Sequence, residues 1–135
     1  MRVVALDYGE KRIGVAVAQT EIGIALPATV LPNDVEAVVR WLKQEGAECV
    51  VVGMPTHLWG EKSVRAQQVE AFIEALQARL NISIETVDER LTTREAERRL
   101  IEGDMRRARR KEVQDAVAAA LILETYLAQF RQKYT

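Results

Sequence analysis

The sequence predicts a single α/β domain built on a mixed five-stranded sheet with helices on both faces. Short apolar runs rich in β-branched residues fall at about residues 2–6, 12–18, 24–31, 48–53 and 82–87. Stretches with the apolar spacing of helices lie between and after the later runs. A chain of 135 residues is long enough for one domain with a substantial core and too short for two. We therefore expect one domain over residues 1–135.

The first three runs follow one another closely, which is typical of antiparallel hairpins. Gly9, Glu10 and Lys11 separate the first two runs. Pro27 removes a backbone donor from the third, so we expect that run to be an edge strand. The later order strand–helix–strand requires parallel neighbours joined by right-handed crossovers. Three antiparallel strands followed by parallel strands give the mixed sheet.

The segments between and after these runs carry capping residues as well as helical spacing. Four helices are expected, with the following caps or bounds: a cap at Asn33 or Asp34, a cap at Ser63, a cap at Thr92 or Thr93 with an end near Gly103, and a last helix from about Glu112 to Phe130. The polar stretch 103–111 between the last two helices is expected to be the longest loop.

Composition restricts the class of protein. Hydrophobic residues make up 48% of the chain and charged residues 29%, as in ordinary soluble proteins. Cys49 is the only cysteine and lies in an apolar run, which excludes a disulfide framework and favours a reducing compartment. The first apolar run is interrupted by Asp7, and no run is long enough to span a bilayer. We expect a cytoplasmic protein with no membrane partner.

Positive charge is concentrated between Arg90 and Lys111. This segment holds nine basic residues and four acids, a net charge of +5 on a chain whose overall net charge is −1. A basic block on an otherwise acidic protein is typical of binding to a polyanion. Residues 94–102 can also be read as a solvated helix face with i,i+4 ion pairs. No acid balances the charge of residues 105–111.

Acidic residues fall where the predicted elements converge. Asp7 ends the first strand, and Asp88 and Glu89 follow the last one. In open α/β sheets, ligands bind at the carboxyl ends of parallel strands. Asp115 interrupts an apolar stripe on the last helix, whose alanines allow a close approach to the sheet. Taken singly, each acid can be a turn residue, a surface residue or a helix N-terminal acid.

Taken together, these acids indicate a divalent-cation site. Clustered carboxylates repel one another, and Mg²⁺ or Mn²⁺ suits a site made of oxygen atoms. Two such ions roughly 4 Å apart can activate water and stabilise the leaving oxygen in phosphodiester cleavage. Zinc is disfavoured because His57 is the sole histidine. Gly9 and Gly14 leave room beside Asp7 for backbone or ligand. The chain has no Walker loop and no GxSxG motif.

Four motifs in order resemble those of the YqgF (RuvX) family over essentially the whole chain. They are Leu6-Asp7-Tyr8-Gly9 with Lys11–Ala16, then Val51–Pro55, then Asp88–Thr93, then Asp115 followed by Ala118-Ala119 and Ile122-Leu123. Members of this family have a ribonuclease H-like fold and are described as Holliday junction resolvases or pre-ribosomal-RNA nucleases. The resemblance implies that Asp7, Glu89 and Asp115 are catalytic and hold Mg²⁺ or Mn²⁺, with Asp88 close by as a further metal ligand.

The resemblance also implies a set of nucleic-acid contacts. The residues concerned are Lys11, Arg12, Arg90, Arg106, Arg107, Arg109, Arg110 and Lys111. The chain departs from the family pattern after Pro55, where Thr56–Gly60 replaces a polar, asparagine-bearing stretch. His57 and Trp59 in that departure are candidates for stacking on a base, or for packing on the helix that follows.

The acids and the basic block predict a metal-dependent nuclease, a hydrolase of phosphodiester bonds in structured nucleic acid. The resemblance implies that it processes the 5′ end of pre-16S rRNA in ribosome biogenesis. Resolution of four-way DNA junctions is the first alternative, and it requires two active sites and hence a dimer. We therefore expect a monomer or a homodimer. A non-catalytic nucleic-acid-binding protein is a further alternative. Actin-like and sugar-kinase ATPases begin with a similar hairpin, but they contain two such domains and are far longer.

Overall fold

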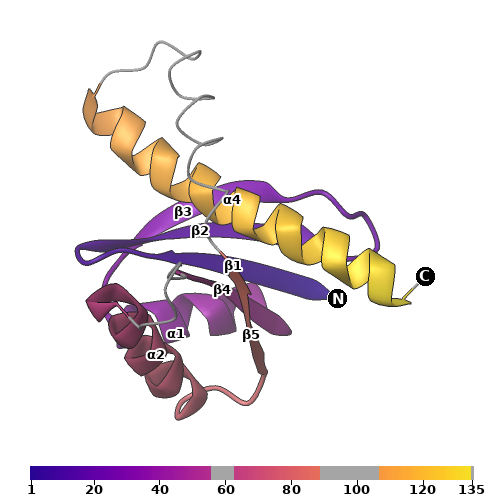
Figure 1. The fold of residues 1–135 in the computed structure, drawn as a ribbon, viewed down its shortest axis with the longest axis horizontal. Coiled ribbons are helices and arrows are strands. Elements are labelled where there is room, and N and C mark those ends of the chain that lie inside the picture. The colour runs from indigo at the N-terminus through magenta and orange to yellow at the C-terminus, as the bar shows by residue number, and fades with distance from the viewer. Residues whose placement is uncertain (56–62, 89–106, 135) are drawn as a thin grey trace.

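A computed structural model describes residues 1–55, 63–88 and 107–134 of the chain. All five expected strands are present, and their ends lie within two residues of the predicted ones. The elements are β1 (Arg2–Tyr8), β2 (Arg12–Gln19), β3 (Leu26–Pro32), α1 (Val35–Glu45), β4 (Cys49–Met54), α2 (Val64–Gln77), β5 (Ser83–Asp88) and α4 (Arg107–Tyr134). Figure 1 labels these elements along the ribbon.

The strands form one mixed sheet in the order β3-β2-β1-β4-β5. β1 pairs antiparallel with β2, and β2 pairs antiparallel with β3. β4 runs parallel to both β1 and β5. This arrangement confirms the predicted sheet, including the edge position of β3. An edge position tolerates Pro27 because the outer side of an edge strand makes no ladder hydrogen bonds.

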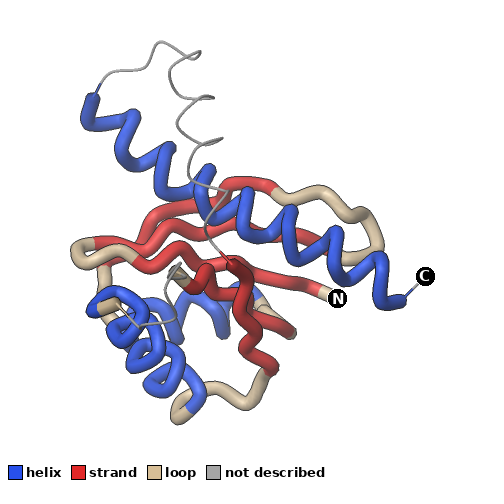
Figure 2. The backbone as a smooth tube through the Cα atoms, viewed as in Figure 1, coloured by secondary structure: helices blue, strands red, loops and turns tan. Residues whose placement is uncertain are grey.

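Helices cover both faces of the sheet, as predicted (Figures 1 and 2). α4 lies across one face, over a core that includes Val3, Ala5 and Val51. α1 and α2 cover the other face, over a core that includes Val4 and Leu6. Successive residues of a strand point to opposite faces. Burial on both sides therefore explains why the central strands are continuous apolar runs rather than alternating ones.

The two N-terminal caps can be assigned from their hydrogen bonds. The side chain of Asp34 accepts a hydrogen bond from the backbone N–H of Glu36, so Asp34 rather than Asn33 caps α1. Ser63 caps α2 as predicted, accepting from the backbone N–H of Ala66. These bonds satisfy donors that the first turn of a helix leaves without an intrahelical partner.

The last helix is longer than the sequence predicts. α4 begins at Arg107 and ends at Tyr134, so residues 107–111, which were expected to belong to a loop, form its first turns. Arginine, alanine and lysine all favour helices, and neither glycine nor proline interrupts this stretch. The expected third helix near residues 92–103 lies outside the described residues. No helix of the described ranges is long and apolar enough to cross a membrane.

Candidate active site

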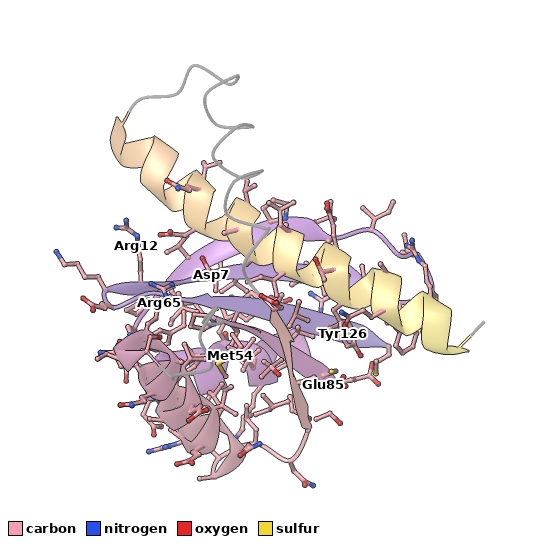
Figure 3. The ribbon with its side chains drawn as sticks, viewed as in Figure 1. Asp7, Arg12, Met54, Arg65, Glu85 and Tyr126 are labelled. Carbon is pink, nitrogen blue, oxygen red and sulfur yellow. The ribbon has the colours of Figure 1, made fainter. Side chains whose placement is uncertain are left out.

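Asp7 lies at the edge of the sheet where the parallel strands β1, β4 and β5 end. Val3 and Ala5 of β1 belong to the core beneath α4, so strand alternation directs Asp7 to the same face. Figure 3 shows Asp7 between the sheet and α4. The Oδ1 atom of Asp7 is buried. A buried carboxylate oxygen is costly unless hydrogen-bond donors or a cation compensate its charge.

Gly14 brings α4 to this part of the sheet. It is the cross-strand partner of Asp7 in the antiparallel pair β1–β2, and directly opposite residues point to the same face. A Cβ atom at Gly14 would lie only 2.0 Å from the backbone oxygen of Asp115 and 2.4 Å from its carbonyl carbon. The backbone of α4 therefore occupies the place of the missing side chain. This contact brings Asp115 to the strand pair that carries Asp7.

Gly9 is required at the turn for a similar reason. A Cβ atom there would lie 2.6 Å from the backbone oxygen of Arg12, closer than a side-chain carbon can approach. The sequence-based expectation that Gly9 and Gly14 permit close approach to the site is confirmed. In both cases the approaching group is the protein's own backbone.

Arg12 makes a direct ion pair with Asp115. The Nε atom of Arg12 lies 2.5 Å from Oδ2 of Asp115, and the two side chains are 34% and 27% exposed. The guanidinium thus compensates the charge of a carboxylate that was expected to hold a cation. Charged hydrogen bonds of this kind are short and strong. Arg12 was expected to contact nucleic acid, and its position beside the acids is compatible with that role.

The turn between β1 and β2 is braced by two side chains that the sequence did not single out for the site. The Nδ2 atom of Asn33 donates to the backbone oxygens of Gly9, at 2.7 Å, and Glu10, at 3.2 Å. Arg65, in the first turn of α2, donates from Nη2 to the backbone oxygen of Tyr8 at 2.6 Å. Lys11 is exposed on this braced turn.

Arg65 adds a cation to the edge where the acids lie (Figure 3). A signal for it exists in the sequence, because a helix that follows β4 must begin near the carboxyl end of that strand. Asn33 carries no comparable signal. Its sequence context predicts only a helix cap. Its contact with the hairpin turn joins residues more than twenty positions apart in the chain.

Asp88 is separated from Asp7 by strand alternation. Its cross-strand neighbour is Met54, which packs in the core beneath α1 and α2. Val87, one residue earlier, is buried beneath α4. Asp88 therefore points to the opposite face of the sheet from Asp7 and is exposed. The structure places both aspartates at one edge but does not bring their side chains together.

The remaining predicted site residues fall into two groups. Glu89, Arg90 and Arg106 lie outside the described residues, as do His57 and Trp59. Arg107, Arg109, Arg110 and Lys111 lie in the first turns of α4, which lead directly to Asp115. These four basic residues and Asp115 are therefore parts of one helix.

Asp7 and Asp115 lie on facing elements, one on the sheet and one on the helix that packs on Gly14. Carboxylate oxygens are the ligands that Mg²⁺ and Mn²⁺ prefer, so the chemistry of this pair suits a hard divalent cation. Within the described ranges no three acidic, histidine or cysteine side chains form a metal-binding group. The third expected ligand, Glu89, lies outside those ranges.

A second polar cluster lies at the opposite edge of the sheet, where Figure 3 shows Glu85 and Tyr126. The Sγ atom of Cys49 lies 3.5 Å from Oε2 of Glu85 and 3.9 Å from the Tyr126 hydroxyl. Burial raises the pKa of the Cys49 thiol from 9.0 to about 11. Burial, together with a hydrogen bond to Glu85, raises the pKa of Tyr126 above its ordinary value of 10. A thiol held protonated in this way is a poor nucleophile and a poor metal ligand.

Sequence comparison gives the family of the chain. The sequence model of the family described as "RuvX: Holliday junction resolvase" matches residues 1–129. A protein from Pelotomaculum thermopropionicum is 41% identical over 133 residues, which cover 94% of this chain and 86% of that protein. A protein from Caldanaerobacter subterraneus subsp. tengcongensis is 43% identical over 133 residues, with 94% and 96% covered. Both relatives are named "Putative pre-16S rRNA nuclease".

Structure comparison confirms the ribonuclease H-like fold. Fowlpox virus resolvase, solved with its Holliday junction substrate, matches with a TM-score of 0.61 at 12% identity, over 96% of this chain and 99% of that one. RuvC of T. thermophilus, also solved with a Holliday junction substrate, matches with a TM-score of 0.60 at 13% identity, over 97% and 96%. Identities this low support the fold alone. From the match over residues 1–129 and the identity of about 40% to these relatives, this chain belongs to the RuvX family.

Proposed function

We propose that this protein is a divalent-metal-dependent nuclease that processes the 5′ end of pre-16S rRNA. The observation that carries the proposal is the placement of Asp7 and Asp115 on facing elements at the carboxyl edge of the sheet, through the contact at Gly14. The names of the relatives support the substrate. The protein acts in the cytoplasm, as a monomer or a homodimer.

In this proposal Asp7, Asp115 and Glu89 hold Mg²⁺ or Mn²⁺. An ion bound there would supply a water nucleophile of lowered pKa and would neutralise charge at the phosphate. Asp7 is well suited to orient the ion because its strand lies in the centre of the sheet and its Oδ1 atom is buried. Asp115 lies on a helix that packs against Gly14 without an intervening side chain. Rigid supports of this kind hold ligands at the positions that chemistry requires.

The basic residues around the edge bind the phosphates of the substrate. Lys11 lies on the turn that follows the strand of Asp7, Arg12 begins β2, and Arg90 follows Glu89 in the sequence. The arginines and lysine at positions 106–111 lead along the chain to Asp115. Arg12 forms an ion pair with Asp115 in this structure. If a cation bound to Asp115, the guanidinium of Arg12 would be released to contact a phosphate. Such contacts give affinity that depends on salt and not on sequence.

Cleavage of four-way DNA junctions is the second candidate, and the family description favours it. Junction resolution requires two cuts placed symmetrically, and hence two copies of this site. The two candidates share the same chemistry at the phosphate. They differ in the substrate and in the need for a dimer, so one assay can separate them.

The test is a cleavage time course on a precursor 16S rRNA fragment and on a matched four-way DNA junction, each with Mg²⁺, Mn²⁺ or EDTA. We expect metal-dependent cleavage of the RNA, lost by orders of magnitude in Asp7→Asn and in Asp115→Asn. Asp88→Asn is the matched comparison, since it removes the same charge from the same edge on the opposite face, and we expect it to keep most of the activity. Melting curves in EDTA check the folding of each variant.

The outcomes discriminate among the candidates. Cleavage of the junction but not of the RNA would favour the resolvase. Binding of either substrate with no cleavage under any metal would favour a non-catalytic binding protein. Equal activity in Asp7→Asn and the unmodified protein would remove the role assigned to Asp7.

A further inference from the structure

An open groove of about 450 Å³ lies beside the acids, between the edge strand β3 and the N-terminal half of α4. Residues 27–30 of β3 form one wall, and Val113, Ala116 and Val117 of α4 form the other. Arg12 of β2 also lines it. We call this space the β3–α4 groove. Its volume lies within the range of pockets that hold a single small ligand.

The groove is continuous with the candidate active site. Val113 and Ala116 flank Asp115 on α4, and the Arg12 that lines the groove is the same residue that binds Asp115. A strand of nucleic acid whose phosphate lies at Asp7 and Asp115 therefore passes the mouth of the groove. The nucleotide next to that phosphate is the group closest to it.

The wall formed by β3 carries a β-bulge. Val15 of β2 is the partner of Thr29 and Ala16 is the partner of Pro27, which leaves Ala28 without a cross-strand partner. A bulged residue is left out of the ladder, and bulges occur often beside active sites. Ala28 therefore lines the groove without a cross-strand partner on β2, unlike the paired residues of an inner strand.

The composition of the groove suits a nucleobase. Its side chains from α4 and most of those from β3 are apolar and compact, which suits the flat face of a base. Backbone groups at the bulge suit the polar edge of a base, which unpaired nucleotides expose to hydrogen-bonding partners. Arg12 adds a guanidinium for the adjoining phosphate or for stacking on the base. A peptide strand is disfavoured as an occupant, because Pro27 and Pro32 limit the pairing of another strand to β3.

We propose that the β3–α4 groove binds one unpaired nucleobase of the substrate strand, next to the phosphate held at Asp7 and Asp115. The assignment rests on the proposed function. It adds a base-binding subsite to a site otherwise built for phosphates. A nuclease with such a subsite acts on single-stranded nucleotides next to the cleaved bond, since a base held in a duplex cannot enter the groove.

The test measures binding of a short single-stranded RNA by fluorescence anisotropy in EDTA and low salt. A series of RNAs carries one abasic position, moved along the strand. We expect one abasic position to weaken binding by about tenfold, in line with the contribution of a single stacked or enclosed base. Other abasic positions should change the affinity less.

Two variants locate the effect. Ala28→Trp fills the groove from an exposed position. The variant should bind intact RNA only as tightly as the unmodified protein binds the sensitive abasic RNA. Its affinity for that abasic RNA should equal that of the unmodified protein. Leu26→Trp is the control, because Leu26 lies on the same strand, is 56% exposed and does not line the groove. We expect it to behave like the unmodified protein. Ala28→Leu, a smaller change, replaces Ala28→Trp if melting curves show that the tryptophan variant is unfolded.

The outcomes separate this proposal from the proposed function. If the unmodified protein cleaves the same RNA with Mn²⁺ but binds intact and abasic strands equally, the groove is not a base site and the nuclease proposal stands. An equal loss of affinity for both RNAs in Ala28→Trp also overturns the groove proposal. Base discrimination that depends on Ala28, without any metal-dependent cleavage, supports the groove and overturns the nuclease.

Discussion

Replacing Gly14 by alanine tests the contact that brings Asp115 to Asp7. The new Cβ atom would lie 2.0 Å from the Asp115 backbone oxygen, 2.4 Å from the Asp115 carbonyl carbon and 3.1 Å from the Ala116 backbone nitrogen. Real Cβ contacts are essentially never shorter than 3.0 Å, so α4 must move away from β2 by about 1 Å. All three atoms belong to the backbone of a regular helix, so no side-chain rotation can relieve the clash.

The size of the effect follows from this displacement. Overpacking a close-packed interior costs about 1–3 kcal/mol, which for a chain of 135 residues lowers the melting temperature by about 4–11 °C. A misplacement of about 1 Å at a catalytic group can cost about a hundredfold in rate. We therefore expect Gly14→Ala to bind Mn²⁺ more weakly and to cleave RNA about a hundredfold more slowly, even at a temperature where it is fully folded.

Ile122→Ala is the matched control. Ile122 lies on the same helix and is completely buried, and its truncation leaves a cavity that costs about 2–5 kcal/mol without pushing α4 off the sheet at Asp115. Melting curves in EDTA, titration calorimetry with Mn²⁺ and cleavage well below the melting temperature compare the two variants. We expect only Gly14→Ala to lose metal affinity. If Gly14→Ala melts and binds Mn²⁺ like the unmodified protein, α4 does not rest on Gly14, and the proximity of Asp7 and Asp115 is wrong.

Three further predictions concern charge. The first changes four arginines of the basic block, Arg106, Arg107, Arg109 and Arg110, to alanine. Affinity for all RNA sequences should fall alike, and the slope of log affinity against log salt should fall by about one for each phosphate that the protein no longer binds. An unchanged slope would make these arginines part of a solvated surface. Arg12→Gln should tighten Mn²⁺ binding about two- to fivefold, because the partly exposed guanidinium of Arg12 no longer competes with the cation for Asp115. Weaker or equal Mn²⁺ binding would show that Arg12 and the cation do not compete. The pKa of Cys49 is raised in the folded protein to about 11, so its contribution to the free energy of unfolding is complete below about pH 9 and is lost as the pH rises toward 11. Urea denaturation over this pH range should show a shallower fall in Cys49→Ala, and identical slopes in the two proteins would contradict the raised pKa.

Some of the candidate site could be located from the sequence because it depends on local patterns. A β-branched run that ends in Asp7 predicts a carboxylate at a strand end, and the order of the later strands predicts that β1, β4 and β5 end at one edge. Asp115 was singled out because an acid interrupts an apolar helical stripe. The structure confirms that this residue reaches the strand pair of Asp7, while its role as a metal ligand stays a prediction.

Strand alternation at the end of β5 separates two of the candidate acids. Consecutive residues of a strand face opposite sides, so Asp88 and Glu89 cannot both point toward Asp7 if the strand continues through them. The structure shows Val87 beneath α4 and Asp88 on the other face. The start of α4 was misplaced for a different reason. The high charge of residues 105–111 is typical of a loop, but the residue types of this run favour a helix.

By itself, the sequence determined the α/β class, the order of the strands along the chain, the edge position of β3 and the candidate acids, because each of these follows from periodicity, turn residues and the geometry of connections. Only the tertiary structure decided which side chains meet. Arg12 and Asp115 are 103 residues apart, and Arg65 of α2 donates to the end of β1. The β3–α4 groove likewise lies between two segments far apart in the chain. Local patterns decide which face a residue presents, whereas packing decides what that face touches.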